Sequence, residues 1–193
     1  YSALFSRPLL DAIPTGTRGQ VLDLGCGTGH PALDVLRRMA DHGRVIAIDR
    51  DSGLVDLARR RAVEASGKRI FFKVESMDEL SFGDEVFDLA VGNLIFGGLD
   101  ADASVLGEKT ALGEIRRVLV PGGRALLSRP LAGTFEEVLD MLREVTLRRD
   151  LTGAQKRRDV LSARHPTASA WAAQLTGAGV ADVQGDVVEH RLA

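Results

Sequence analysis

The chain has 193 residues, of which 45% are hydrophobic and 27% are charged, and its formal net charge is -2. This length and apolar fraction predict one globular domain with a buried core. The near balance of charge argues against a general affinity for nucleic acid or for an anionic membrane surface. The single cysteine, Cys26, excludes an internal disulfide, and the sequence has no cysteine and histidine cluster with metal-ligand spacing.

No targeting or membrane segment is visible in the sequence. The longest apolar stretch is far shorter than the roughly 20 residues that span a bilayer, and the first residues lack the basic and then apolar layout of a signal peptide. We therefore expect a cytoplasmic protein without a membrane partner. Because the chain begins at Tyr1 and ends soon after a strand-like run, we also expect that one or both natural ends are missing.

Helical and strand-like apolar patterns alternate along the chain. Helical spacing predicts helices over residues 2–13, 31–40, 52–65, 103–119, 135–147 and 168–178. Short apolar runs predict strands over residues 20–24, 44–48, 70–74, 86–91, 124–128 and 180–192. This alternation predicts an α/β fold, in which a doubly wound, mostly parallel sheet is covered by helices on both faces.

A glycine turn follows the first predicted strand, in the run VLDLGCGTG that starts at Val21. Gly25, Gly27 and Gly29 allow the backbone to turn sharply and to approach a ligand that a Cβ atom would block. Asp49 ends the second predicted strand, where its carboxylate can accept hydrogen bonds from the two hydroxyls of a ribose. The pattern predicts a ligand that contains a nucleoside.

Two details favour a cationic adenosyl ligand over a dinucleotide. Asp23 is an acid inside the first predicted strand, and a carboxylate at this place suits ammonium and sulfonium charge and is unfavourable for a pyrophosphate. The glycines are spaced G-C-G-T-G, whereas the dinucleotide pattern is G-x-G-x-x-G. The sequence therefore predicts S-adenosylmethionine as the ligand of the turn.

Four blocks follow one another between residues 20 and 128: VLDLGCGTG at 21–29, VIAIDRD at 45–51, ESMDELSFGDEVFDLAVGN at 75–93 and LGEIRRVLVPGGRALLS at 112–128. On these blocks the chain resembles the class I S-adenosylmethionine-dependent methyltransferases of the small-molecule type. The resemblance implies a Rossmann-like sheet of strand order 3-2-1-4-5-(7)-6. Only six strands are visible, so the seventh strand is expected to be missing, which would leave an open slot that a partner or a swapped homodimer could fill.

The resemblance also implies roles for the turn and for the end of the second strand. The backbone around Gly25, Cys26 and Gly27 would hold the methionine part of the cofactor, next to Gly29. Asp23 would lie near its ammonium group. Asp49 and Arg50 would frame the ribose and the adenine.

Further contacts are implied after the third and fourth strands. Ser76 stands where the family commonly has an acid against the adenine amino group, and either Ser76 itself or Asp78 would take that role. Met77 would supply a backbone amide to the adenine ring. Gly92 and Asn93 would contact the methionine part and face the incoming acceptor.

The predicted organisation is a single methyltransferase domain over residues 1–193, with a cofactor-binding core at 20–128, a helical acceptor-side or lid segment at 130–178 and a final strand at 180–192. The arginines and lysines between Arg143 and His165 have two interpretations, a solvated helix face or a lid for an anionic acceptor. Trp171, at helical spacing, is interpreted as a core residue and not as a platform for the substrate.

The predicted function is transfer of a methyl group to a small-molecule acceptor by in-line displacement, for which a general base is not obligatory. His30 and His165 are the candidate bases. The acceptor and the methylated atom stay open. The alternative is a sensor or scaffold domain that binds S-adenosylmethionine without transfer activity. An aminopropyl transferase is a weaker alternative, because NLIFGG after the fourth strand supplies no acidic pair for an amine.

Overall fold

The computed structural model describes residues 2–63, 69–96, 105–150, 153 and 165–189. The chain divides into two compact units, Tyr1–Arg129 and Pro130–Ala193. The second unit starts at Pro130, where the sequence predicts that the helical acceptor-side or lid segment begins, and the role of that segment stays a prediction. Each unit is described below by itself.

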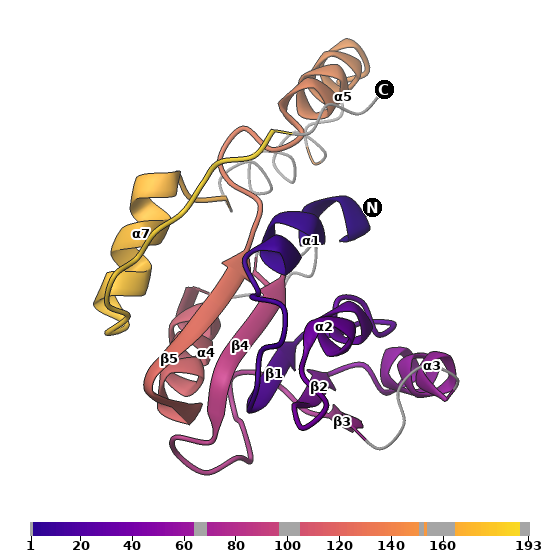
Figure 1. Ribbon diagram of the computed structural model, residues 1–193. Helices are drawn as coiled ribbons and strands as arrows, with labels where there is room; N and C mark the ends of the chain where they lie inside the picture. The colour runs from indigo at the N-terminus through magenta and orange to yellow at the C-terminus, as the bar shows by residue number, and fades with distance from the viewer. Residues whose placement is uncertain (1, 64–68, 97–104, 151–152, 154–164, 190–193) are drawn as a thin grey trace. The chain divides into compact units, whose positions relative to one another are not determined.

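The first unit alternates strands and helices as predicted (Figure 1). Its elements in chain order are α1 Ser2–Asp11, β1 Gln20–Leu24, α2 Ala32–Arg38, β2 Arg44–Asp49, α3 Ser52–Ala62, β3 Ile70–Val74, β4 Phe87–Asn93, α4 Val105–Val118 and β5 Leu119–Ser128. Asp51 caps α3 because its carboxylate accepts hydrogen bonds from the amides of Gly53 and Leu54. The predicted helices are confirmed in type, and the predicted residues 64–65 and 103–104 lie outside the described residues.

The five strands form one parallel sheet of order β3-β2-β1-β4-β5. This order confirms the Rossmann-like, doubly wound fold. Leu24 pairs in register with Ile48 on one side and with Gly92 on the other. The carboxyl ends of β1, β2 and β4 therefore meet at one edge of the sheet, which is where parallel α/β sheets bind their ligands.

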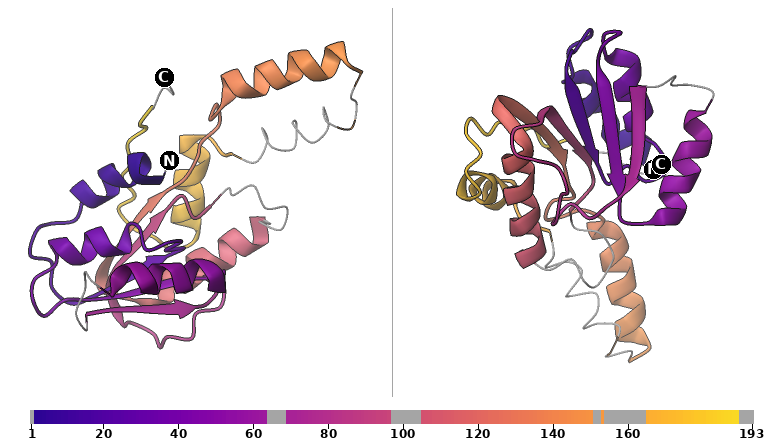
Figure 2. Two further views of the ribbon diagram at one scale, coloured as in Figure 1. Left: turned by 90° about the vertical axis from the view of Figure 1, so that its right-hand side faces the viewer. Right: turned by 90° about the horizontal axis from the view of Figure 1, so that it is seen from below.

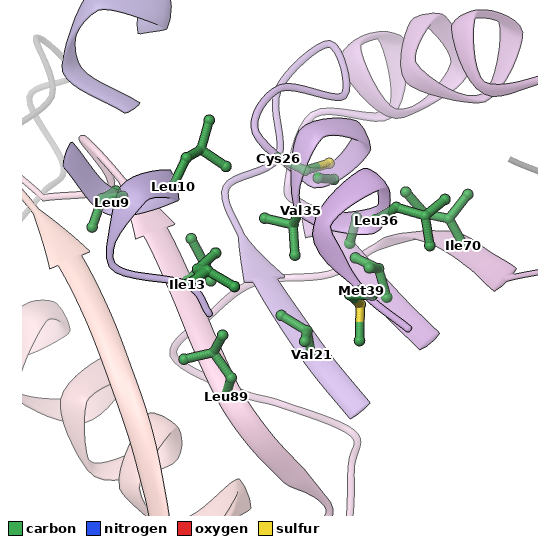
Figure 3. Close-up of a cluster of buried hydrophobic side chains, with 14 of the residues drawn as sticks. Leu9, Leu10, Ile13, Val21, Cys26, Val35, Leu36, Met39, Ile70 and Leu89 are labelled. Carbon is green, nitrogen blue, oxygen red and sulfur yellow. The ribbon is translucent and has the colours of Figure 1, made fainter. Parts of the chain in front are cut away.

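The core lies against both faces of the sheet. On one face Val21, Val45 and Val91 pack with buried residues that include Ile13, which follows α1, and Val35 of α2. Figure 3 shows Val21, Ile13 and Val35 of this cluster. The alternate strand residues point to the opposite face because side-chain direction has a period of two along a strand. Figures 1 and 2 show α4 beside β5 on that side, and its buried residues are Ala111, Leu112, Ile115 and Val118.

β5 starts earlier than the sequence predicts, at Leu119 instead of Arg124. The Pro-Gly-Gly turn was expected to precede the strand, but it forms an irregularity within it: Phe87 pairs with Leu119, and Leu89 then pairs with Arg124. Gly123 makes this possible, because a Cβ atom there would lie only 2.9 Å from the carbonyl oxygen of Val120.

The second unit contains α5 Glu136–Arg148 and α7 Ala168–Gly177. The predicted strand at 180–192 is wrong for the part that is described, because residues 180–189 have no strand pairing. This segment is mostly exposed, and a strand forms only where a neighbour accepts its backbone hydrogen bonds. Residues 190–192, and with them the end of that prediction, lie outside the described residues, as do Lys156, Arg157, Arg158 and Arg164 of the predicted basic lid.

Among the described helices, none has both the length and the apolar character that crossing a membrane requires. Trp171 of α7 is half-buried and does not lie in a closed core. The open slot presupposed a sixth strand beside β5, which the described residues 180–189 do not form. The homodimer stays a prediction.

Candidate functional site

The turn after β1 has the backbone conformation that its glycines predict. Gly25, Gly27 and Gly29 have φ values of 64°, 53° and 98°, in the left-handed region that other residues rarely adopt. A Cβ atom on Gly25 would lie 2.9 Å from Cγ2 of Ile95, whereas a Cβ atom on Gly27 would meet no atom within 4 Å. Gly27 therefore borders open space at the carboxyl edge of the sheet.

Asp49 holds this turn in place. One carboxylate oxygen, Oδ2, accepts a hydrogen bond of 2.8 Å from the amide of Gly27, and Oδ1 accepts one of 2.9 Å from the amide of Asp51. The amide of Cys26 donates to the carbonyl of Ile48 over 2.8 Å. Each carboxylate oxygen has a second lone pair, so Asp49 can still accept a hydroxyl from a ligand beside Gly27.

Asp23 is fully buried within β1. It is in register with Ala47 of β2 and Val91 of β4. Neither of its oxygens has a hydrogen-bond partner among the described residues. Burial raises the pKa of Asp23 well above its ordinary value, the nearby amide of Ala32 lowers the pKa in part, and the charge of Asp49 raises it further. A buried acid without a partner suits a cationic ligand group.

The other predicted residues of the turn are placed differently. The side chain of Cys26 points into the core (Figure 3), so only its backbone can face a ligand. Burial raises the pKa of the Cys26 thiol, and the charges of Asp23 and Asp49 raise it further, which makes the thiol a poor nucleophile. Arg50 is exposed directly after β2, next to Asp49.

The two candidates for the adenine contact lie together after β3. The hydroxyl of Ser76 donates a hydrogen bond to the carboxylate of Asp78, and both side chains are exposed. Met77 between them is half-buried. The structure thus joins the two residues that the sequence offered as alternatives, so that an acid is present beside Ser76.

The end of β4 is tied to the end of β5. Asn93 is buried, and its Oδ1 accepts a hydrogen bond of 2.9 Å from the hydroxyl of Ser128. The same hydroxyl oxygen accepts the amide of Leu94 over 3.0 Å. Next to Ser128, the guanidinium of Arg129 forms an ion pair of 3.0 Å with Glu108 of α4. These contacts fix the backbone that the sequence assigns to the acceptor side.

Comparison with known proteins decides the family. A family described as a methyltransferase domain matches residues 21–123, which is more than half of the chain. The chain belongs to this methyltransferase family. The resemblance inferred from the four sequence blocks is thereby confirmed.

Individual relatives agree with this assignment. The methyltransferase domain is 30% identical over 124 residues to a ubiquinone/menaquinone biosynthesis C-methyltransferase of Geobacter sulfurreducens, covering 62% of this chain and 46% of that protein. It is 31% identical over 134 residues to the aklanonic acid methyltransferase DauC of a Streptomyces species, covering 67% and 57%. The crystal structure of the YcgJ protein of Bacillus subtilis has the same fold, with a TM-score of 0.64 at 23% identity, over 89% of this chain and 65% of that one. The chain spans about half the length of the curated relatives.

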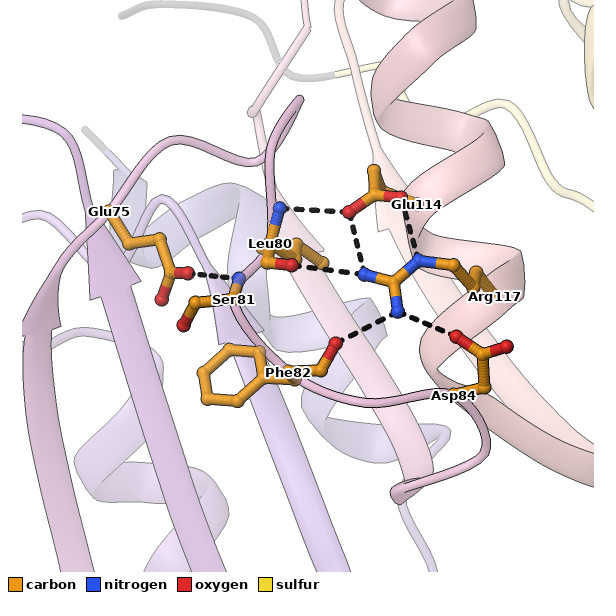
Figure 4. A network of polar contacts seen from close by, with 7 residues as sticks. All are labelled: Glu75, Leu80, Ser81, Phe82, Asp84, Glu114 and Arg117. Carbon is orange, nitrogen blue, oxygen red and sulfur yellow. Dashed lines mark hydrogen bonds and ion pairs between the residues drawn. The ribbon is translucent and has the colours of Figure 1, made fainter.

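A polar network that the sequence analysis missed orders the segment between β3 and β4 of the methyltransferase domain (Figure 4). Arg117 of α4 donates to the carbonyls of Leu80 and Phe82 over 3.0 and 2.8 Å and to the carboxylate of Asp84 over 2.8 Å. Glu114 pairs with Arg117 and accepts the amide of Leu80 over 2.8 Å. In the sequence, the three-residue spacing of Glu114 and Arg117 indicates only an ion pair along one helix. It does not indicate that Arg117 also binds loop carbonyls.

Glu75 begins the same segment. Its carboxylate accepts the amide of Ser81 and forms an ion pair of 3.0 Å with Lys73. Burial raises the pKa of Glu75, but these hydrogen bonds and the charge of Lys73 outweigh burial and lower the pKa overall. Glu75 and the Arg117 network together hold the loop that carries Ser76 and Met77.

Replacing Arg117 with methionine is expected to lower the free energy of unfolding by about 2 kcal/mol, because several hydrogen bonds to loop carbonyls are lost together. Thermal unfolding measures this change. The matched control is R148M, which removes one exposed pair with Glu144 in α5 and is expected to change stability by less than about 0.5 kcal/mol. Equal melting temperatures for the two variants would contradict a role for Arg117 in ordering the loop.

His30, a candidate base, is held between two helices of the methyltransferase domain. Its Nε2 lies 2.6 Å from the hydroxyl of Ser6 in α1, and its Nδ1 lies 2.6 Å from the carboxylate of Asp34 in α2. Both ring nitrogens are therefore engaged. The other candidate, His165, belongs to the second unit and is half-buried there.

Replacing His30 with alanine is expected to reduce stability and to leave methyl transfer largely intact. The loss of two hydrogen bonds should lower the free energy of unfolding by about 1–2 kcal/mol. We expect kcat/KM to stay within about tenfold of the wild type, since a residue with both nitrogens engaged is not placed to accept a proton. H42A, at an exposed histidine, is the control. A far larger loss of kcat/KM at unchanged stability would identify His30 as a base.

Proposed function

We propose that this chain is an S-adenosylmethionine-dependent methyltransferase domain that transfers a methyl group to a small organic acceptor. The observation that carries the proposal is the buried carboxylate of Asp23, without a hydrogen-bond partner in the described residues, beside a turn that is open at Gly27. A pyrophosphate would be repelled by that carboxylate, whereas an ammonium group would satisfy it. The residues present therefore fit an adenosyl ligand with a cationic amino acid tail.

Each part of this ligand has residues suited to hold it. Asp23 would pair with the ammonium group, and the backbone around Gly27 would bind the amino acid tail. Asp49 would accept the ribose hydroxyls with the lone pairs that its two backbone hydrogen bonds leave available. Ser76 and Asp78 would accept the adenine amino group. When bound, the ligand supplies a methyl group on a positively charged sulfur, which is an electrophile.

The contribution of the protein to transfer is then alignment and exclusion of water. Asn93 and Ser128 tie the ends of β4 and β5 together, and these residues would help to position an acceptor held over this edge for attack. An acceptor that ionises by itself would need no protein base. The names of the relatives favour a small organic acceptor, and carbon is the atom to test first, because one of them is named as a C-methyltransferase.

Calorimetry followed by product analysis tests this function. S-adenosylmethionine and S-adenosylhomocysteine should both bind, with dissociation constants in the micromolar range that is common for substrates. Incubation with methyl-labelled S-adenosylmethionine and a panel of quinones, phenols and β-dicarbonyl compounds should transfer label to at least one acceptor. Failure of both ligands to bind would overturn the proposal. Binding without label transfer to any acceptor would support the sensor or scaffold alternative.

A further inference from the structure

The surroundings of Asp23 bear on its protonation. An ionised carboxylate that leaves water is stable only beside a cation or several hydrogen-bond donors. Asp23 has neither among the residues that the structure describes, because its side chain is fully buried and neither oxygen has a hydrogen bond of ordinary geometry, although the backbone amide of Ala32 lies near enough to lower its pKa in part. The uncharged acid avoids most of this desolvation cost.

The neighbouring strands add no compensating charge. On β2, Asp49 lies close enough for its negative charge to disfavour a second one on Asp23. The register neighbours on the two flanking strands, Ala47 and Val91, have no polar side chain. Both strands that pair with β1 therefore favour the protonated form.

Groups of the turn and of α2 also lie near Asp23. The thiol of Cys26 is buried and uncharged, and α2 contributes the backbone amide of Ala32. His30 follows the turn, but its ring is engaged by the hydroxyl and the carboxylate of two other residues, Ser6 and Asp34. None of these groups supplies the positive charge that an ionised Asp23 requires.

We propose that Asp23 is protonated in the ligand-free protein and that it releases this proton to solvent when the ammonium group of S-adenosylmethionine binds beside it. The charged pair then replaces a neutral buried acid. This inference rests on the proposed function, because it takes the ligand of the turn to be an amine. It makes cofactor affinity dependent on pH through a residue that binds the cofactor.

The affinity consequence follows from linkage. While the free protein carries the proton, each unit of rising pH should tighten binding by about tenfold, since one proton leaves for each ligand bound. The ligand amine must stay charged, and an α-amino group loses its proton near pH 8. The dissociation constant should therefore fall from pH 5 to pH 7.

The stability consequence has the opposite sign. A carboxyl that keeps its proton in the folded state contributes stability that is present below the unfolded pKa and is lost as pH rises towards the folded pKa. Asp23 therefore destabilises the ligand-free protein at neutral pH. Replacing Asp23 with asparagine should raise the melting temperature at pH 8 by roughly 3 °C or more and change it little near pH 4.

Calorimetry of the whole chain at pH 6.5 tests proton release directly. The heat of binding is measured in two buffers with different ionisation enthalpies, and their comparison gives the number of protons released. S-adenosylmethionine and S-adenosylhomocysteine both carry the ammonium group and should release about one proton each. Methylthioadenosine lacks that group and should bind without release. D23N should release no proton with any of these ligands.

The ligand-free stability of D23N is the second measurement, with D88N as the control. Asp88 is exposed at the other end of the sheet and accepts the amide of Gln20 over 2.7 Å, so D88N should not become more stable with rising pH. Binding of S-adenosylmethionine without proton release, or a D23N variant no more stable than the wild type at pH 8, would overturn the inference alone. If no ligand binds, the proposed function and the linkage both fail.

Discussion

Replacing Gly27 with alanine is expected to weaken S-adenosylmethionine binding by roughly 30- to 100-fold, because the new methyl group would enter the space that the ligand fills, at a cost of about 2–3 kcal/mol. The space is open in the structure, since a Cβ atom on Gly27 would meet nothing within 4 Å. Calorimetry with the whole chain measures the dissociation constant.

Backbone strain is the competing explanation, and Gly122 provides a matched control. Gly27 has a φ of 53° and Gly122 a φ of 78°, and a Cβ atom on Gly122 would also meet nothing within 4 Å. Each alanine variant should lose about 1–2 kcal/mol of stability from the left-handed conformation. Only G27A should lose affinity. If G122A binds equally poorly, strain and not ligand contact explains the result.

Replacing Asp49 with alanine is expected to weaken S-adenosylmethionine binding by roughly 100-fold or more. Each hydrogen bond to a charged group contributes about 1.5–3 kcal/mol, and both ribose hydroxyls would lose one. The variant also removes the acceptor for the amides of Gly27 and Asp51. Adenosine is a useful second ligand, because it contains the ribose and lacks the amino acid tail; its affinity should fall as well.

Asp51 is the control for the structural part of that loss. Its carboxylate also accepts two backbone amides, those of Gly53 and Leu54 at 2.8 and 3.1 Å, so D51A should lose about 0.5–2 kcal/mol of stability. It caps α3 and is not assigned to the ribose. The role of Asp49 is disproved if D51A reduces the affinity for adenosine as much as D49A does.

Local patterns predicted most of the fold because each element follows from short-range rules. Apolar runs and helical spacing placed all five strands and the helices between them, and the parallel order follows from the alternation of strands and helices. The exception is the strand expected at 180–192. Strand pairing depends on a distant partner, and alternation of apolar residues carries no information about whether that partner exists.

The candidate site could also be located from the sequence, because the types and spacing of its residues are characteristic. Gly25, Gly27 and Gly29 could be assigned to a turn because their spacing is diagnostic, and the left-handed φ values agree. The sequence could not show whether the backbone or the side chain of Cys26 faces the ligand. That side chain lies in the core because it packs in a cluster with buried residues of β1, β2 and α2, which is a tertiary arrangement.

The sequence by itself determined that the run VLDLGCGTG forms a strand and a glycine turn, that Asp49 follows at the end of the next strand, and that the chain belongs to a methyltransferase family. The first two conclusions need only neighbours in the chain, and the family follows from blocks that keep their order along residues 21–123. The tertiary structure decided that Asp23 is buried without a hydrogen-bond partner in the described residues, and that Arg117 orders the loop from residue 80 to residue 84. Burial and polar partners depend on which segments pack together, and that packing joins residues far apart in the sequence.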